Sequence, residues 1–249
     1  MIGVKLNGGL GNMMFQIAFI ESMSKKHGFD VKYCYLYENF DFIKTYPMRE
    51  YAYEYFSIFK NINWLKNQDE EFERSLTFSP YYAEIDPVDN ILYCGYFQSE
   101  KYFYDREFIK WLFEFSEKMD SLPGITCSIH IRRGDYLYHP EIHPALDMDY
   151  YEEAMSLLPI VDKYYVFSDD LEWCKDRFAG SKFDLVSKKD YEEMQMMSLC
   201  TYNIIANSSF SWWGAYLGKQ NMVIAPRRYV GTEIINDMMD IIPPNWIKI

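Results

Sequence analysis

The residues of this chain that could do chemistry gather in a short segment near its middle. His130, Arg132 and Asp135 stand close together at the end of a β-rich run. Residues two apart in a strand share one face, so His130 and Arg132 should point the same way. An arginine at the end of a buried strand needs an anionic partner, and a diphosphate matches its forked guanidinium. The alternative is a surface ion pair in which Arg133 and Asp135 neutralise each other.

Two other segments resemble anion-binding loops, because each follows a predicted strand and opens a predicted helix. Residues 8–12 read GGLGN and residues 207–211 read NSSFS. Backbone N–H groups at the start of a helix attract phosphate oxygens. The glycine spacing is not that of a dinucleotide fingerprint, and Asp30 precedes the second strand instead of ending it. A tight turn without a ligand, and Ser211 as a simple helix cap, are the structural alternatives.

Two pairs of carboxylates could hold a metal ion, but each also fits a helix cap. Asp169 and Asp170 end a predicted strand and precede a predicted helix. They could bind metal, accept hydrogen bonds from a purine base, or cap the helix. Asp147 and Asp149 form an Asp-x-Asp motif, yet Asp149 with Glu152 is also a capping box, which we prefer. Because the sequence shows no other cluster of oxygen ligands, it predicts no metal.

The composition is that of an acidic globular protein. With 37 Asp and Glu against 25 Lys and Arg, the formal net charge is −12, which opposes nucleic-acid binding. Any diphosphate must therefore be held by a local concentration of basic residues. The five cysteines are scattered without a C-x-x-C pair, so neither a disulfide framework nor a zinc site is predicted. No apolar run is long enough for a signal peptide or a transmembrane helix, and we expect a cytoplasmic protein.

The elements that position these residues alternate between strands and helices. Strands are predicted at 2–6, 31–36, 90–97, 125–131, 164–167, 183–186, 203–206 and 222–225. Helices are predicted at 13–26, 104–119, 149–157, 171–178, 190–201 and 211–217, with further short helices between 39 and 121. Such alternation predicts parallel, doubly wound sheets that bind ligands at the carboxyl ends of their strands. The breaker Leu122-Pro123-Gly124 divides the chain into domains 1–121 and 122–249.

Four segments, taken in order, resemble the inverting fucosyltransferases, and most closely the bacterial type of the α-1,2-fucosyltransferase family. They are residues 8–12, residues 130–136, residues 167–170 with Trp173, and residues 207–214. The resemblance implies an α/β, GT-B-like fold, in which two Rossmann-like domains face each other across a cleft. It also implies that the first domain lies on the acceptor side and that the second binds the GDP sugar.

The resemblance further implies the reaction and its partners. L-fucose would move from GDP-fucose to a hydroxyl of a galactose-containing glycan, with inversion and without a metal or cofactor. The hydroxyl expected from the resemblance is that of position 2 of a terminal galactose. Two alternatives stay open. One is transfer of another nucleotide sugar or to another acceptor position, and the other is a non-catalytic glycan-binding protein of the same fold.

The resemblance assigns donor-binding roles to residues in all four segments. Arg132 would contact the β-phosphate, and His130 would lie near the nucleoside. The remaining donor-binding residues would be Gly11 and Asn12 at the diphosphate, Asp169 or Asp170 at the guanine edge, and Ser208, Ser209 and Phe210 along the nucleotide.

Breaking the bond between the sugar and the phosphate leaves negative charge on the diphosphate. Without a metal, Arg132 must stabilise that charge, helped by backbone N–H groups. An inverting displacement also needs a base for the acceptor hydroxyl, and we expect Asp135 first and Glu141 second. His139 and His143 follow in the same loop; they could contact substrate, but we expect them to be solvated.

Overall fold

The computed structural model describes residues 1–35, 72–77, 82–219, 221–231 and 239–249. The chain forms two compact units, Met1–Glu117 with Met239–Pro243 and Lys118–Met238 with Pro244–Ile249. This division falls a few residues before the predicted boundary at 121/122, and Met239–Pro243 joins the first unit, although the prediction placed it in the second. The short helices expected between residues 39 and 71 lie outside the described residues.

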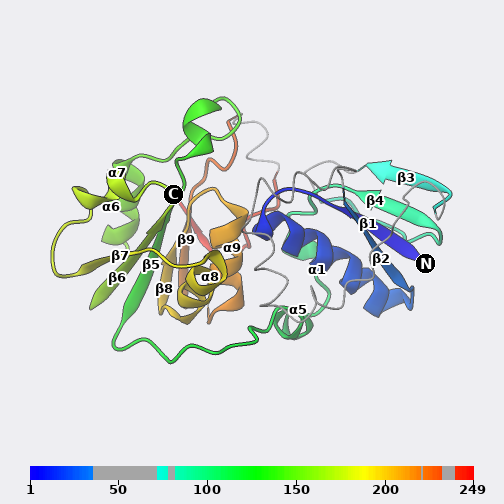
Figure 1. The fold of residues 1–249 in the computed structure, drawn as a ribbon, viewed down its shortest axis with the longest axis horizontal. Helices are drawn as coiled ribbons and strands as arrows, with labels where there is room; N and C mark the ends of the chain where they lie inside the picture. The colour runs from blue at the N-terminus through cyan, green and yellow to red at the C-terminus, as the bar shows by residue number, and fades with distance from the viewer. Residues whose placement is uncertain (36–71, 78–81, 220, 232–238) are drawn as a thin grey trace. The chain divides into compact units, whose positions relative to one another are not determined.

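The first unit contains a four-stranded parallel sheet with α1 (Leu10–His27) packed along it (Figure 1). In spatial order its strands are β2 (Val31–Tyr35), β1 (Ile2–Leu6), β4 (Ile91–Cys94) and β3 (Arg74–Thr77). Strand β1 begins and ends as predicted, whereas β4 is shorter than expected. Strand β3 was not predicted, because three of its four residues are exposed and give no hydrophobic alternation.

Helix α1 begins three residues earlier than the sequence predicts and ends one residue later. Gly9 is its extended N-cap, so Gly11 and Asn12 lie in the first helical turn instead of in a loop. Gly28 ends the helix in the left-handed conformation, with φ of 77°, and its N–H donates to the carbonyl of Ser24. A glycine-rich stretch is therefore compatible with helix once its first two glycines have turned the chain.

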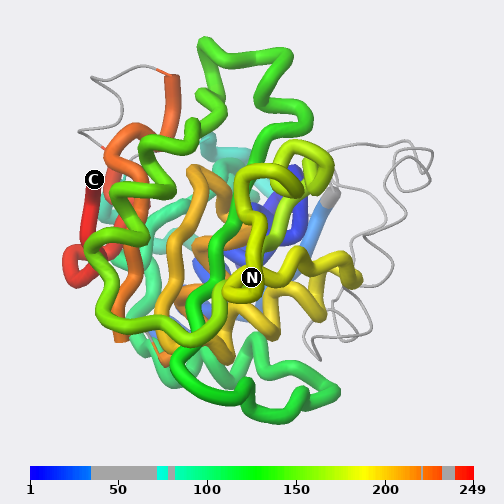
Figure 2. The backbone as a smooth tube through the Cα atoms, turned by 90° about the vertical axis from the view of Figure 1, so that its left-hand side faces the viewer, coloured from blue at the N-terminus to red at the C-terminus, as the bar shows by residue number. Residues whose placement is uncertain are grey.

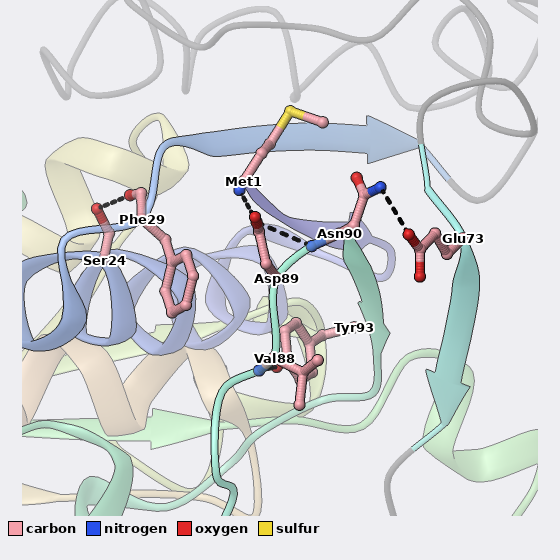
Figure 3. Close-up of polar contacts among 8 residues, drawn as sticks. All are labelled: Met1, Ser24, Phe29, Glu73, Val88, Asp89, Asn90 and Tyr93. Atoms are coloured by element: carbon pink, nitrogen blue, oxygen red, sulfur yellow. Dashed lines mark hydrogen bonds and ion pairs between the residues drawn. The ribbon is translucent and has the colours of Figure 1, made fainter.

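Polar contacts tie the amino ends of strands β1, β3 and β4 together (Figure 3). The amino group of Met1 pairs with the carboxylate of Asp89, which also accepts a hydrogen bond from the N–H of Asn90. Asn90 has a left-handed φ of 67°, and its side-chain amide donates to Glu73 at 3.5 Å. The opposite, carboxyl edge of this sheet is where the glycine loop follows β1.

The helix predicted over residues 104–119 is mostly absent. A 3-10 turn, η1 (Glu100–Tyr102), is followed by α5 (Arg106–Leu112), whose N-cap Asp105 accepts from the N–H of Phe108. An aspartate cap favours a start after itself, which explains the later beginning. The backbone leaves the helix at Phe113, which is buried.

The second unit contains a six-stranded parallel sheet. In spatial order its strands are β10 (Ile247–Lys248), β9 (Met222–Ala225), β8 (Tyr202–Ile204), β5 (Thr126–Ile131), β6 (Lys163–Ser168) and β7 (Phe183–Val186). Its helices are α6 (Met148–Ser156), α7 (Leu171–Lys175), α8 (Asp190–Leu199) and α9 (Ser209–Leu217), with the 3-10 helix η2 (Asp135–Tyr138). Each predicted strand and helix of this half is present, while β10 and η2 were not predicted.

Helices cover both faces of this sheet. Successive residues of a strand point to opposite faces, so neighbouring residues of one strand pack against different helices. On β6, Val166 packs into a core with Tyr151 of α6, whereas the next residue, Phe167, packs with Met197 of α8. Strand β5 is buried along its whole length, as expected for a strand covered on both faces. Its residue His130 faces the same side as Phe210 of α9.

The strand order reverses at β5 in the second unit and at β1 in the first. From β5 the chain moves outward through β6 to β7, and β8 and β9 lie on the other side of β5. In an open parallel sheet, ligands bind at the carboxyl ends of the strands where the order reverses. The carboxyl ends of β5 and β8 are therefore where the fold favours a ligand-binding site.

No helix in the described part of the chain is long and apolar enough to cross a membrane.

Candidate functional site

Three neighbouring strands of the second unit place their following loops at one edge of the sheet. These are β8, β5 and β6, and the loops contain residues 205–208, 132–147 and 169–170. The segment after β5 (green) rises above the sheet in Figures 1 and 2. All the predicted site residues of the second half lie in these loops, at the strand ends, or in the first turn of α9.

The guanidinium of Arg132 lies between two carboxylates. One nitrogen is 2.6 Å from Asp135 Oδ1 and another is 3.0 Å from Asp169 Oδ2. The arginine side chain keeps 35% of its surface exposed, so it remains open to a further anionic partner. The alternative prediction, an ion pair between Arg133 and Asp135, is wrong. Arg133 pairs with Asp170 instead.

Asp169 holds the turn that carries both arginines. Its Oδ1 accepts a hydrogen bond of 2.9 Å from the backbone N–H of Arg133, while its Oδ2 faces Arg132. A Cβ on Gly134 would lie 2.6 Å from that same Oδ2, so only glycine allows the carboxylate to approach. The carboxylate is thus engaged on both oxygens, and its predicted contact with guanine stays a prediction.

Asp170 confirms the capping interpretation. It is the N-cap of α7 and accepts from the N–H of Trp173 at 3.1 Å. Its other oxygen is 3.2 Å from Nε of Arg133, whose guanidinium lies 4.3 Å from the centre of the Trp173 ring. Asp170 therefore links the helix start to the arginine turn through both a cap and an ion pair.

His130 is buried and uncharged at neutral pH. Only 6% of the residue is exposed, and its ring centre lies 5.6 Å from that of Phe210. Burial, helped by the nearby positive charge of Arg132, lowers the pKa of His130 to about 3. Its Nδ1 is buried and has no hydrogen-bond partner among the described residues. A buried polar atom of this kind is expected where a ligand completes the site.

The serine segment forms the start of α9 with Ser208, not Ser211, as the cap. Ser208 Oγ accepts from the N–H of Phe210 at 3.4 Å, and Ser211 Oγ donates to the carbonyl of Ser208. Ser209 opens the helix. In the same way α6 is capped by Asp147 and not by the predicted Asp149, since Asp147 accepts from the N–H of Tyr150.

Sequence reasoning missed Tyr136 and Asn207, which join the loops after β5 and β8. The Tyr136 hydroxyl donates to the carbonyl of Asn207 at 2.9 Å, and the Asn207 amide donates to the carbonyls of Pro144 and Tyr229. Burial raises the pKa of Tyr136 to about 12, with nearby Arg132 opposing the shift. The available signal was their place inside the motif segments 130–136 and 207–214.

The two histidines of the loop after β5 differ in their surroundings. His139 is exposed, as expected, and its Nδ1 lies 3.8 Å from Glu141. His143 is not simply solvated, because its ring stacks on Tyr136 with centres 4.8 Å apart and planes 16° apart. The Arg132 guanidinium lies 5.4 Å from the centre of the same Tyr136 ring. The expectation for His143 is thus corrected.

Gly11 and Asn12 belong to the first unit and follow β1, the strand at which the strand order of its sheet reverses. Asn12 Oδ1 accepts a hydrogen bond of 2.8 Å from the side chain of Gln98, in the segment that follows β4. Gly8 has a left-handed φ of 78°, and a Cβ there would lie 2.5 Å from Asn12 Nδ2. Two side-chain amides therefore meet at this edge, which suits hydrogen bonding to a polar ligand.

The described residues contain no group of three or more His, Cys, Asp or Glu side chains arranged to hold a metal ion. Asp169 and Asp170, the adjacent carboxylates after β6, both face arginines. The predicted independence from metal remains a prediction.

Solved structures show which fold these units represent. Fucosyltransferase NodZ from Bradyrhizobium superposes on 87% of this chain and 93% of its own, with a TM-score of 0.51 and 12% sequence identity. At that identity the likeness concerns the fold alone. The fold class is α/β of the GT-B type with two Rossmann-like units, as predicted.

Curated proteins with similar sequences are glycosyltransferases. The O-antigen biosynthesis glycosyltransferase WbnK of Escherichia coli is 37% identical over 50% of this chain and 44% of its own. An alpha-1,2-colitosyltransferase of Escherichia coli is 33% identical over 64% of this chain and 63% of its own. Galactoside alpha-(1,2)-fucosyltransferase 1 of Bos taurus is 27% identical over 38% of this chain and 30% of its own. Each match therefore spans less than two thirds of the relative's length.

One family accounts for the whole sequence, because its pattern matches residues 1–249 from end to end. The segments that form the arginine turn, the capped α7 and the start of α9 all lie within this match. The chain belongs to glycosyl transferase family 11.

Proposed function

We propose that this protein transfers L-fucose from GDP-fucose to hydroxyl 2 of a terminal galactose in a glycan, with inversion. The observation that carries the proposal is Arg132, a partly exposed guanidinium at the reversal of strand order in an acidic protein. Family membership supports glycosyl transfer, and relatives named as α-1,2-transferases support the linkage. The choice of fucose and GDP rests on the resemblance of the four sequence segments.

The charges around Arg132 fit the binding of a diphosphate. Asp169 is fixed by its second hydrogen bond to the arginine turn, whereas the Asp135 side chain is 61% exposed. Phosphate oxygens and a carboxylate compete for the same guanidinium N–H groups. We expect the diphosphate to replace Asp135 at Arg132, while Asp169 keeps the guanidinium in place.

The buried ring of His130 and the start of α9 complete the proposed donor site. The unpartnered Nδ1 of His130 is available to a nucleoside, and Phe210 offers an aromatic edge beside it. The backbone N–H of Ser209, in the first turn of α9, suits a phosphate oxygen, whereas that of Phe210 is taken by the cap oxygen of Ser208. In the first unit, the side-chain amides of Asn12 and Gln98 suit hydrogen bonding to a polar ligand.

The sequence predicts that Asp135, or as second choice Glu141, is the base that takes the proton of the acceptor hydroxyl. Asp135 pairs directly with Arg132, so its carboxylate also serves to hold the arginine. An Asp135→Asn variant separates the two roles. As the base, Asp135 would be required for turnover but not for GDP binding, whereas a role at the arginine alone would change GDP affinity first.

The test is direct. The protein is incubated with GDP-fucose and a panel of galactosides, and the product linkage is read by NMR. We expect an α-1,2-fucoside, and we expect it to form equally in excess EDTA. Failure to form product with any galactoside, or a strict need for Mn²⁺, would contradict the corresponding part of the proposal.

A second candidate donor is favoured by one relative. The alpha-1,2-colitosyltransferase matches more of this chain than the other two curated relatives do. GDP-colitose is therefore compared with GDP-fucose and GDP-mannose in the same assay. Thermal shift gives an independent readout, since a donor at 100 times its Kd stabilises the protein by about 2.7 kcal/mol. A non-catalytic glycan-binding protein would form no product with any donor.

A further inference from the structure

The imidazole of His143 and the guanidinium of Arg132 both lie beside the ring of Tyr136. His143 stacks on Tyr136 at 4.8 Å, and Arg132 lies 5.4 Å from the centre of that same ring. His143 is half-buried, and its ring nitrogens make no hydrogen bond within the described residues. A ring that is stacked in place while its nitrogens stay free is poised to exchange a proton.

The loop holds this imidazole in a defined position. The Tyr136 hydroxyl is anchored on the Asn207 carbonyl, and the neighbouring Pro144 carbonyl accepts from the Asn207 amide. The backbone N–H of His143 donates to the backbone carbonyl of His139 at 2.9 Å. The backbone N–H of Gly231 donates to the carbonyl of Ile142. These contacts fix the loop on both sides of the histidine, as preorganised catalysis requires.

The direction of an inverting displacement separates the base from the leaving group. The acceptor oxygen attacks the anomeric carbon from the side opposite to the departing diphosphate. Asp135 is bonded to the guanidinium that is proposed to hold that diphosphate, so it lies on the leaving-group side. The proton acceptor must lie farther away, within about 3 Å of the attacking hydroxyl in the reacting complex.

We propose that His143 is the catalytic base, which takes the proton of the attacking acceptor hydroxyl. This inference rests on the proposed function, and it assigns the role of base to His143 in place of Asp135 and Glu141. The acceptor O–H bond breaks as its oxygen forms the new bond to the anomeric carbon. The bond between that carbon and the phosphate oxygen breaks, and GDP leaves with the electron pair. The proton moves to a ring nitrogen of His143 and then to solvent.

The charge state of His143 suits this role. Burial lowers its pKa from the ordinary value, and Arg132 and His139 lower it further, while Asp135 raises it. From the neighbouring elements, Asp169 of the β6 end faces Arg132, and Tyr229 lies near Tyr136. The imidazole is therefore neutral at pH 7 and able to accept a proton.

The decisive variant is His143→Phe, which keeps an aromatic ring on Tyr136 but cannot accept a proton. We expect kcat to fall by about 100-fold or more, since general base catalysis contributes about 10²–10⁴. The donor KM and the thermal shift caused by GDP should stay unchanged. The matched control is His139→Phe, which removes the exposed histidine of the same loop and should leave kcat within about twofold of wild type.

The pH profile provides a readout that a structural role would not move. Wild-type kcat should decrease as the pH falls through the lowered pKa of His143, and residual His143→Phe activity should lack that decrease. If His143→Phe unfolds, His143→Asn takes its place in the same measurements. A variant with near-wild-type kcat, or with lost GDP binding, would overturn the inference. Wild-type protein inactive with every donor would instead overturn the proposed function.

Discussion

Single residues in this protein carry several contacts at once, and Asp169 shows this most clearly. One carboxylate positions Arg132, accepts from the N–H of Arg133 and fills the space above Gly134. Of these three contacts, Asp135 makes only the one to Arg132. We therefore treat Asp169 as the fixed positioning partner of Arg132 and Asp135 as the partner that an incoming phosphate displaces.

The role of Arg132 is tested by Arg132→Ala and Arg132→Lys. Losing one preorganised charged contact to a leaving group costs about 10²–10³ in rate, and we expect at least that for alanine. Lysine keeps the charge but not the fork that spans Asp135 and Asp169, so it should recover only part of kcat. Steady-state kinetics with circular dichroism as a folding check gives both values.

The control for charge is Arg177→Ala, which removes an exposed arginine of the same unit that contacts Trp173. It should keep nearly full activity. Near-normal turnover in a well-folded Arg132→Ala variant would refute the leaving-group role.

At the level of elements, buried parallel strands deliver the reactive residues and short turns aim them. Strand β5 ends at Ile131, and the next residues form the arginine turn before η2 begins at Asp135. At Gly134 this turn passes close to the side chain of Asp169, just after the end of β6. A larger residue there would push the two apart.

We expect Gly134→Ala to destabilise the second unit by about 1–3 kcal/mol, the usual cost of forcing atoms into a packed site. Its added Cβ would meet Asp169 Oδ2 at 2.6 Å, so the arginine turn must shift and GDP affinity should fall. Urea denaturation and GDP thermal shift measure the two effects. Gly9→Ala is the comparison, because a Cβ there meets nothing within 4 Å and only the N-cap preference of α1 is changed; an equal loss in both variants would contradict the explanation.

Most elements of the second unit were predictable because their residues repeat simple patterns. Strands β7 and β9 begin and end at the predicted residues, since each is a short, mostly apolar run flanked by polar or helix-breaking residues. The caps were less predictable. Asp147 and Asp149 both have the right chemistry for α6, and the backbone alone decides that Asp147 accepts from Tyr150.

At the level of the whole molecule, a strongly acidic chain places two adjacent arginines, each paired with carboxylates, where its second sheet reverses its strand order. The formal net charge is −12, yet Arg132 and Arg133 adjoin each other directly after β5. The pairing of each arginine with a carboxylate keeps these charges in place without a ligand. Long-range repulsion of an anionic donor by the rest of the chain should weaken as salt screens it.

The buried histidine makes stability depend on pH. The pKa of His130 is about 3 in the folded protein and near 6.5 when unfolded, so the folded state disfavours its protonation. This contribution is complete above pH 6.5 and is lost as the pH falls towards 3, at about 1.4 kcal/mol per pH unit. The free energy of unfolding, measured by urea denaturation between pH 7 and 4.5, should fall accordingly.

Carboxylates also titrate over this range, so the contribution of His130 is isolated by difference. His130→Phe should show a shallower decrease than wild type, whereas His139→Phe, which lacks only an exposed imidazole, should follow wild type. Parallel curves for wild type and His130→Phe would show that burial of this histidine does not govern the pH dependence.

The sequence by itself determined the alternation of strands and helices and the order of the motifs. It also indicated the diphosphate chemistry of Arg132, because these depend on local spacing and residue type. Only the tertiary structure decided the partners: Asp135 and Asp169 for Arg132, Asp170 for Arg133, and Tyr136 for His143. Asp169 and Arg132 are far apart along the chain and meet because β5 and β6 pair in parallel register. Local patterns specify such elements, but side-chain contacts between loops depend on how neighbouring strands align.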